Sequence, residues 1–125
     1  MNKQNDILKY YKEELKWNPP FADIFSSYAP EALGGYLQMR EYVQNGKLSS
    51  KIRELIFTIL DTLDGELEGA KAHAKKAIVE GLSIEELVET FVIMTMVKGI
   101  NVMCTGGSEV IKAAEEHYKA LNNIK

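Results

Sequence analysis

Hydrophobic and polar residues follow a helical spacing along most of the chain, and no segment shows the strict alternation of a half-buried strand. The clearest pattern lies between residues 52 and 63, where large aliphatic residues recur every three or four positions. They are Ile52, Leu55, Ile56, Ile59, Leu60 and Leu63. This stripe predicts an amphipathic helix that packs on a core, and the whole pattern predicts an all-α fold of about six helices.

Proline and glycine divide the first half of the chain. A first amphipathic segment, about 6–17, is expected to stop at Asn18-Pro19-Pro20, because proline lacks a backbone donor and restricts the residue before it. Pro30 is suited to the first position of a helix over about 31–44, and Asn45-Gly46 is expected to end that helix in the left-handed conformation.

Similar signals divide the second half. Ser49 or Ser50 is expected to cap the striped helix, and Asp64-Gly65 to end it. The next helix is predicted over about 66–80, with Gly81 as its stop.

The following helix start has the best local signature in the chain. Ser83-Ile84-Glu85-Glu86 forms a capping box, and Leu82 with Leu87 forms a hydrophobic staple around it. From Phe91 to Val97 this helix is apolar on almost every side, so we expect either a central helix or an oligomer interface. Gly99 predicts a break before the last segment.

Composition narrows the class of protein. The 125 residues, 46% of them hydrophobic and with a net charge of −3, predict one soluble globular domain over 1–125. No basic stripe favours nucleic acid as a partner, and the longest apolar stretch is too short to cross a membrane. A single cysteine and a start without an apolar leader predict a cytoplasmic protein.

His73 is the best candidate for chemistry. A step of 100° per residue places it on one helix face with Glu66, Gly69, Lys76 and Glu80. A histidine beside carboxylates is suited to moving protons near neutral pH, because its ordinary pKa is about 6.5. The alternative is a half-exposed polar helix face on which His73 is solvated or paired with Glu66 or Lys76.

Cysteine and metal chemistry have weaker support. Cys104 follows Val102 and Met103, and this apolar neighbourhood predicts core packing. His73 and His117 are far apart in sequence, and no close pair of ligands suggests a metal site. We therefore expect neither a metal nor an organic cofactor.

A longer frame surrounds His73. Glu54 lies nineteen residues before it (73 − 54), Glu66 and Gly69 stand seven and four residues before it, and Gly81-Leu82-Ser83 follows it. This frame resembles the alkyl hydroperoxidase D (AhpD)-like and γ-carboxymuconolactone decarboxylase superfamily. The thiol members of that superfamily carry a Cys-x-x-Cys pair at the positions of Glu66 and Gly69.

The resemblance covers about 30–116 and implies an AhpD-like helical domain that forms homotrimers or homohexamers. In the thiol branch, the glutamate and histidine look like a proton relay for the cysteines. Since this chain lacks the pair, peroxidase or peroxiredoxin activity is disfavoured, and a peroxidase would depend on Cys104.

The decarboxylase branch also lacks the cysteines, and its resemblance implies cofactor-independent proton transfer on a small acidic lactone. His73 would be the general acid or base, oriented by Glu54 or Glu66. Gly69 and Lys98 are the candidate substrate-binding residues, with Arg53 as another cation for a substrate carboxylate; Lys98 equally suits a stabilising charge at a helix C-terminus.

One departure concerns Gly99-Ile100-Asn101, which lacks the proline of the decarboxylase Gly-x-Pro segment. Two main alternatives follow: a carboxy-lyase that uses His73, or a family member that has become a non-catalytic binding or structural oligomer. An enzyme predicts His73 in a closed pocket, whereas a scaffold predicts an exposed His73.

Overall fold

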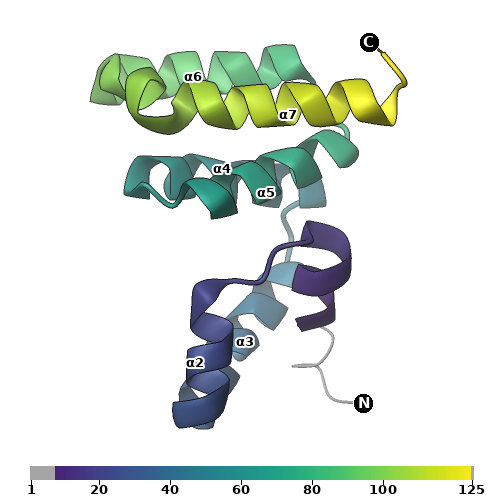
Figure 1. Cartoon of the computed structure of the whole chain (residues 1–125), viewed down its shortest axis with the longest axis vertical. Coiled ribbons are helices and arrows are strands. Elements are labelled where there is room, and N and C mark those ends of the chain that lie inside the picture. The colour runs from purple at the N-terminus through teal and green to yellow at the C-terminus, as the bar shows by residue number, and fades with distance from the viewer. Residues whose placement is uncertain (1–7, 125) are drawn as a thin grey trace. The chain divides into compact units, whose positions relative to one another are not determined.

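The computed structural model describes residues 8–124, which fall into two compact units, Met1–Leu48 and Ser49–Lys125. The described residues of both units are helical and contain no strand, which confirms the all-α prediction (Figure 1). No helix within 8–124 combines the length and the apolar character needed to span a bilayer.

The first unit consists of the π-helical segment η1 (Tyr10–Leu15) and the α-helices α2 (Pro20–Tyr28) and α3 (Pro30–Gln44). A proline takes the first position of both α-helices, because no intrahelical bond needs its missing N–H there. Lys16, in the left-handed conformation with φ 55°, ends η1 just before the predicted proline break. Residues 6 and 7 of the predicted first helix lie outside the described residues.

The prediction of a left-handed stop at Asn45-Gly46 is wrong. Asn45 has φ −105°, and the glycines with positive φ are Gly65, Gly81 and Gly99. At the end of α3 the Gly46 N–H donates instead to the carbonyl oxygen of Val43, at 3.2 Å. The lack of space therefore favours glycine at position 46, because a Cβ there would lie 3.2 Å from the carbonyl oxygen of Tyr42.

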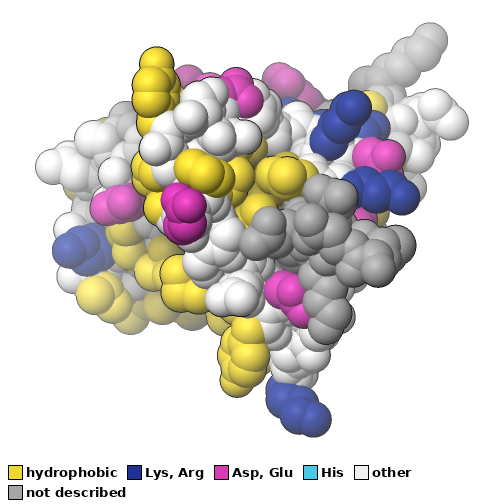
Figure 2. Space-filling model, turned by 90° about the horizontal axis from the view of Figure 1, so that it is seen from below, with side chains coloured by type: hydrophobic (Ala, Val, Ile, Leu, Met, Phe, Trp, Pro, Cys, Tyr) yellow, Lys and Arg dark blue, Asp and Glu magenta, His cyan; other side chains and the backbone are white. Residues whose placement is uncertain are grey.

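Aromatic side chains fasten η1 to α3. The Arg40 guanidinium carbon lies 5.2 Å from the ring centres of both Tyr10 and Tyr11, a cation–π arrangement. The hydroxyl groups of Tyr11 and Tyr36 are 3.0 Å apart. Other hydrophobic side chains of this unit, including Tyr28, are exposed, and hydrophobic side chains protrude on the face shown in Figure 2.

The second unit contains α4 (Ser50–Asp64), α5 (Leu67–Val79), α6 (Ile84–Lys98), the π-helical η2 (Met103–Gly107) and α7 (Ser108–Leu121). Figure 1 shows α4 and α5 in one layer and α6 and α7 in a second layer, with the core between them. The core cluster consists of Ala70, Ala74, Ala77, Ile78, Leu82, Leu87, Phe91, Met94, Val102, Val110 and Ala114.

The helix boundaries of this unit follow the predicted signals. The Ser49 hydroxyl accepts from the Ile52 N–H, and Gly65 ends α4 with φ 82°. The capping box of α6 is complete, because Ser83 and Glu86 each accept a hydrogen bond from the other's backbone N–H, at 3.0 and 2.9 Å.

The prediction that the whole aliphatic stripe of α4 packs on the core is wrong. Leu55 and Ile59 do pack against it, but the other four members of the stripe are exposed: Ile52, Ile56, Leu60 and Leu63. The stripe is wider than the surface that the core offers. An adjacent, polar sector of α4 is buried instead, and it carries Arg53, Glu54, Thr58 and Thr62.

The buried polar sector is tolerated because its hydroxyl groups have partners within the helix. Thr58 Oγ1 donates to the carbonyl oxygen of Glu54 at 2.8 Å, and Thr62 Oγ1 donates to that of Thr58 at 2.7 Å. Buried hydroxyl groups without partners would destabilise the fold.

The prediction that Cys104 packs in the core is also wrong, because its side chain is exposed. The buried residues of η2 are Gly106 and Gly107. A Cβ on Gly106 would come within 2.5 Å of Leu67 Cδ2, so the glycine side of η2 is the side that packs. Cys104 therefore takes the outer side of the segment.

Candidate active site

Two helices bring the main candidates together. Glu54 lies in the second turn of α4 and His73 in the middle of α5, and the turn at Gly65 joins the two helices. The His73 Nδ1 is 2.7 Å from Glu54 Oε1, a short hydrogen bond between two buried side chains. The spacing of nineteen residues thus becomes a direct contact.

Arg53 completes the surroundings of the carboxylate. Its Nε lies 3.5 Å from Glu54 Oε2, and its Nη2 donates to the Ser50 hydroxyl at 3.1 Å. A buried carboxylate is costly unless it is paired and hydrogen-bonded. Here Arg53 and His73 contact different oxygens of Glu54, so the carboxylate is both paired with a cation and hydrogen-bonded.

Phe57 and Asp61 approach the His73 ring from the same helix as Glu54. The Phe57 ring is stacked on the imidazole, with 4.6 Å between centroids and 20° between planes. Asp61 Oδ2 lies 3.9 Å from His73 Nε2. Positions 54, 57 and 61 are three and seven residues apart and therefore share one face of α4.

The contacts assign the roles of the two ring nitrogens. A carboxylate only accepts hydrogen bonds, so an ionised Glu54 requires the hydrogen to lie on Nδ1. In the neutral ring with its hydrogen on Nδ1, the acceptor nitrogen is Nε2. The contact with the buried carboxylate of Glu54 therefore orients the His73 ring.

The other predicted residues have different places. Glu66 is exposed and its carboxylate accepts from the Gly69 N–H at 3.2 Å, capping α5, whereas Gly69 itself is buried. Lys98 is exposed in the last turn of α6, where a cation suits the helix dipole. Of the two carboxylates considered as partners for His73, the structure therefore places Glu54 against the ring.

Burial of His73 contradicts the alternative of a half-exposed polar helix face. The positions of Phe57 and Asp61 beside the His73 ring could not be predicted from the sequence. Their spacing from Glu54 was visible, but the aliphatic stripe on the same helix suggested that the polar sector faced solvent. Only the packing of α4 shows that this sector is the buried one.

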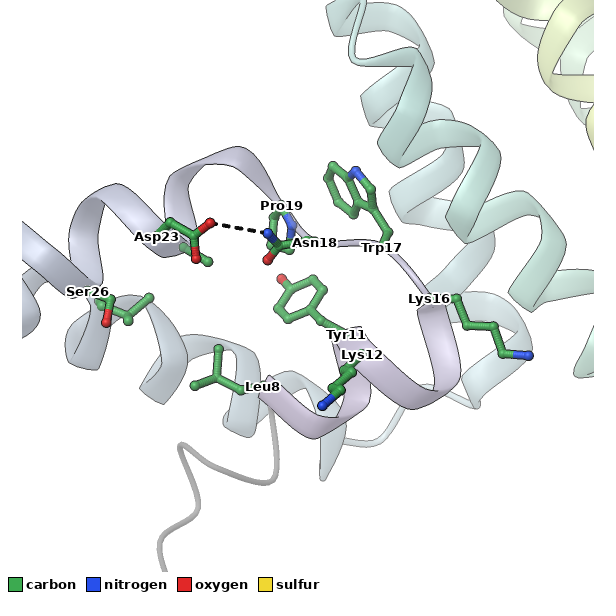
Figure 3. Close-up of a pocket in the computed structure, with 11 residues that line it drawn as sticks. Leu8, Tyr11, Lys12, Lys16, Trp17, Asn18, Pro19, Asp23 and Ser26 are labelled. Carbon is green, nitrogen blue, oxygen red and sulfur yellow. Dashed lines mark hydrogen bonds between the residues drawn. The ribbon is translucent and has the colours of Figure 1, made fainter.

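The cavities that the described residues line include two whose lining contains neither His73 nor Glu54. One, of about 590 Å³, lies in the first unit; Figure 3 shows Tyr11 pointing toward Asn18, whose Nδ2 donates to Asp23 Oδ2 at 3.4 Å. The second, of about 500 Å³, lies beside η2 and includes Cys104. Within 8–124, no group of three or more His, Cys, Asp or Glu side chains is arranged to hold a metal ion.

Comparison with known proteins agrees with the family resemblance of the sequence around His73. The model of the carboxymuconolactone decarboxylase family matches residues 30–105. A solved structure of a proposed carboxymuconolactone decarboxylase from Burkholderia xenovorans LB400 is similar, with 29% identity, a TM-score of 0.80 and coverage of 96% of this chain and 97% of that one. No curated protein matches. The chain belongs to the carboxymuconolactone decarboxylase family.

Proposed function

We propose that the protein is a cofactor-independent enzyme that transfers a proton between His73 Nε2 and a small acidic substrate of the lactone type. The observation that carries the proposal is the 2.7 Å contact between His73 and the fully buried Glu54. This contact orients the imidazole, and general acid and base catalysis requires a positioned side chain. The family membership and the lack of a Cys-x-x-Cys pair favour the decarboxylase reaction.

The reaction would proceed in two steps. The bond between the substrate carbon and its carboxylate breaks, CO₂ leaves, and the electron pair is delocalised onto the neighbouring carbonyl. The carbon then takes a proton from His73 Nε2. Glu54 would keep its hydrogen bond to Nδ1 throughout and hold the ring in position.

The substrate carboxylate also needs a partner. Arg53 is buried and holds Glu54, so it supports the site through that carboxylate. Lys98 is exposed and remains our proposed contact for the substrate carboxylate, with Gly69 as a proposed point of close backbone approach.

We also propose that the chain forms a homotrimer or homohexamer. In the second unit, the exposed members of the α4 stripe include Leu60, and α6 exposes Val92, Ile93, Met96 and Val97. Exposed apolar surface of this extent is typical of a protein interface. Of the two sequence-based alternatives for α6, its exposure supports the interface.

The loss of ultraviolet absorbance by γ-carboxymuconolactone tests the reaction. We expect turnover by the wild type, a loss of at least about 100-fold in His73→Ala because general acid–base groups contribute that much, and little change in His117→Gln. Equal turnover in wild type and His73→Ala would refute the role of His73. Absence of turnover in the wild type would refute this substrate.

A further inference from the structure

We propose that the cavity of the first unit is a binding site for a small carboxylic acid with an aromatic ring. The cavity measures about 590 Å³, and its lining lies between residues 8 and 33, so it contains neither Glu54 nor His73. Sites for small molecules usually measure about 300–1,000 Å³ and are largely apolar, with a few polar groups that select the ligand. The inference concerns a second site and does not depend on the proposed reaction.

The buried part of the lining is mainly apolar. It consists of Tyr11, Pro19, Ala22 and Leu33. The half-buried Trp17, which also lines the cavity, meets the Tyr11 ring edge-on, with 6.4 Å between centroids and 69° between planes. Aromatic rings attract one another in edge-on and in offset-stacked arrangements. A flat ring in the cavity would therefore gain contact with two aromatic side chains of the lining.

Exposed charged groups of the lining select the sign of the ligand. The described part of the lining holds two lysines, Lys12 and Lys16, and one acidic residue, Asp23. The Asp23 carboxylate accepts a hydrogen bond from Asn18 Nδ2 at 3.4 Å. The Lys16 side chain points away from the other labelled side chains in Figure 3, so we assign Lys12 to the carboxylate of the ligand.

An aromatic carboxylate suits both parts of this lining. Its ring would lie against Tyr11, and its carboxylate would lie beside the Lys12 ammonium group. A neutral aromatic molecule would gain only the first contact, and a cationic one would be repelled by the lysine. Since an exposed ion pair strengthens binding only about two- to fivefold, the ring would supply most of the affinity.

The first test uses Trp17, the single tryptophan of the chain, whose fluorescence reports on the cavity that it lines. Wild-type protein is titrated with benzoate and with benzamide, which has the same ring without the charge. We expect a saturable change with both, benzoate binding about two- to fivefold more tightly at low salt, and no difference at about 1 M salt, which screens exposed charges. Absence of a saturable change with benzoate, or equal binding of both at low salt, would overturn the proposal. Emission that depends on protein concentration and not on benzoate would assign the cavity to a second copy and would also overturn it.

The second test locates the ligand with variants. Lys12→Gln should weaken benzoate binding about two- to fivefold and leave benzamide binding unchanged. Lys47→Gln removes an exposed lysine of the same unit that does not line this cavity, so it should bind benzoate as the wild type does. An equal loss in both variants would trace the effect to net charge and overturn the role of Lys12. His73→Ala should also bind benzoate normally, and loss of binding there would move the ligand to the candidate active site and overturn the proposal.

Discussion

At the residue scale, Glu54 has two neighbours that depend on it. Arg53 and His73 are both buried, and each contacts one oxygen of its carboxylate. Removal of one partner from a buried ionic contact leaves the others without compensation for their lost hydration. Glu54 should therefore matter for stability as well as for the tautomer of His73.

We predict that Glu54→Ala lowers the free energy of unfolding by about 3–5 kcal/mol, because it leaves buried polar groups unpaired. Glu54→Gln keeps the shape and an acceptor oxygen, so it should lose less stability while losing most of the activity. Urea unfolding of the two variants beside wild type measures the difference. Equal stability of Glu54→Ala and wild type would contradict the buried contact.

Cys104, unlike Glu54, should be dispensable for the proposed reaction. Its thiol is exposed in η2, and none of the proposed proton transfers uses it. Cys104→Ser should therefore turn over lactone at the wild-type rate. Peroxide consumption by the wild type that disappears in this variant would instead support the thiol peroxidase that the sequence disfavours.

The partnership of Glu54 and His73 was predictable from their spacing within a family frame, but their burial was not. Burial depends on which sector of α4 faces α5, and the aliphatic stripe pointed to the wrong sector. The approach of Asp61 to the ring could not be predicted for the same reason, since it depends on which sector of α4 faces α5.

At the element scale, the helix boundaries were largely predictable because caps are local. Ser49, Gly65, Gly81 and the Ser83 capping box all act within a few residues of the chain. The turn at Asn45-Gly46 differs from its prediction. Glycine occurs where the backbone is left-handed and also where a Cβ would have no room, and position 46 is of the second kind. The two conditions cannot be told apart without the neighbouring carbonyl groups.

The capping box of α6 makes stability depend on pH. The Ser83 backbone N–H donates to the Glu86 carboxylate and lowers its pKa below the ordinary 4.5. A carboxyl group whose pKa is lowered on folding adds stability above its unfolded pKa and loses that contribution as pH falls through the folded pKa. Glu86→Gln should therefore lose stability at pH 7 and little at pH 2, and thermal unfolding at both values measures this. An equal deficit at both would contradict the charged cap.

The two glycines of η2 allow two close contacts to be compared. A Cβ on Gly106 would meet the end of the flexible Leu67 side chain, whereas on Gly107 it would lie 2.8 Å from the carbonyl oxygen of Val102. Backbone yields less readily than a side-chain terminus. Gly107→Ala should thus destabilise the protein by about 1–3 kcal/mol and more than Gly106→Ala does, as measured by urea unfolding. The reverse order would contradict the packing of η2.

At the scale of the whole molecule, the all-α class followed from the hydrophobic period, and the family frame supplied the arrangement of the second unit. Exposure could not be predicted in the same way. A hydrophobic stripe shows that a helix face avoids water, and it does not show whether the cover is the same chain or another copy. In α4 and α6 much of the apolar surface remains exposed on the single chain.

We predict that charges on this surface break self-association without unfolding the chain. Met96 and Leu60 are 80% and 58% exposed, so Met96→Glu and Leu60→Glu should cost the single chain little while opposing burial between copies. Sedimentation velocity should show the wild type as a trimer or hexamer and the double variant as a smaller species of equal helicity. Lys75→Glu, a charge change at an exposed position of α5, serves as control. A monomeric wild type would contradict the interface.

The central claim is that Glu54 holds His73 with Nε2 as the nitrogen that exchanges a proton with the substrate. Nitrogen-15 NMR of the wild-type ring at a pH where it is neutral tests this most directly, because the two nitrogens give different signals in the two tautomers. The 2.7 Å contact predicts the hydrogen on Nδ1 and none on Nε2, with this preference lost in Glu54→Ala. A hydrogen on Nε2 in the wild type would contradict the assignment.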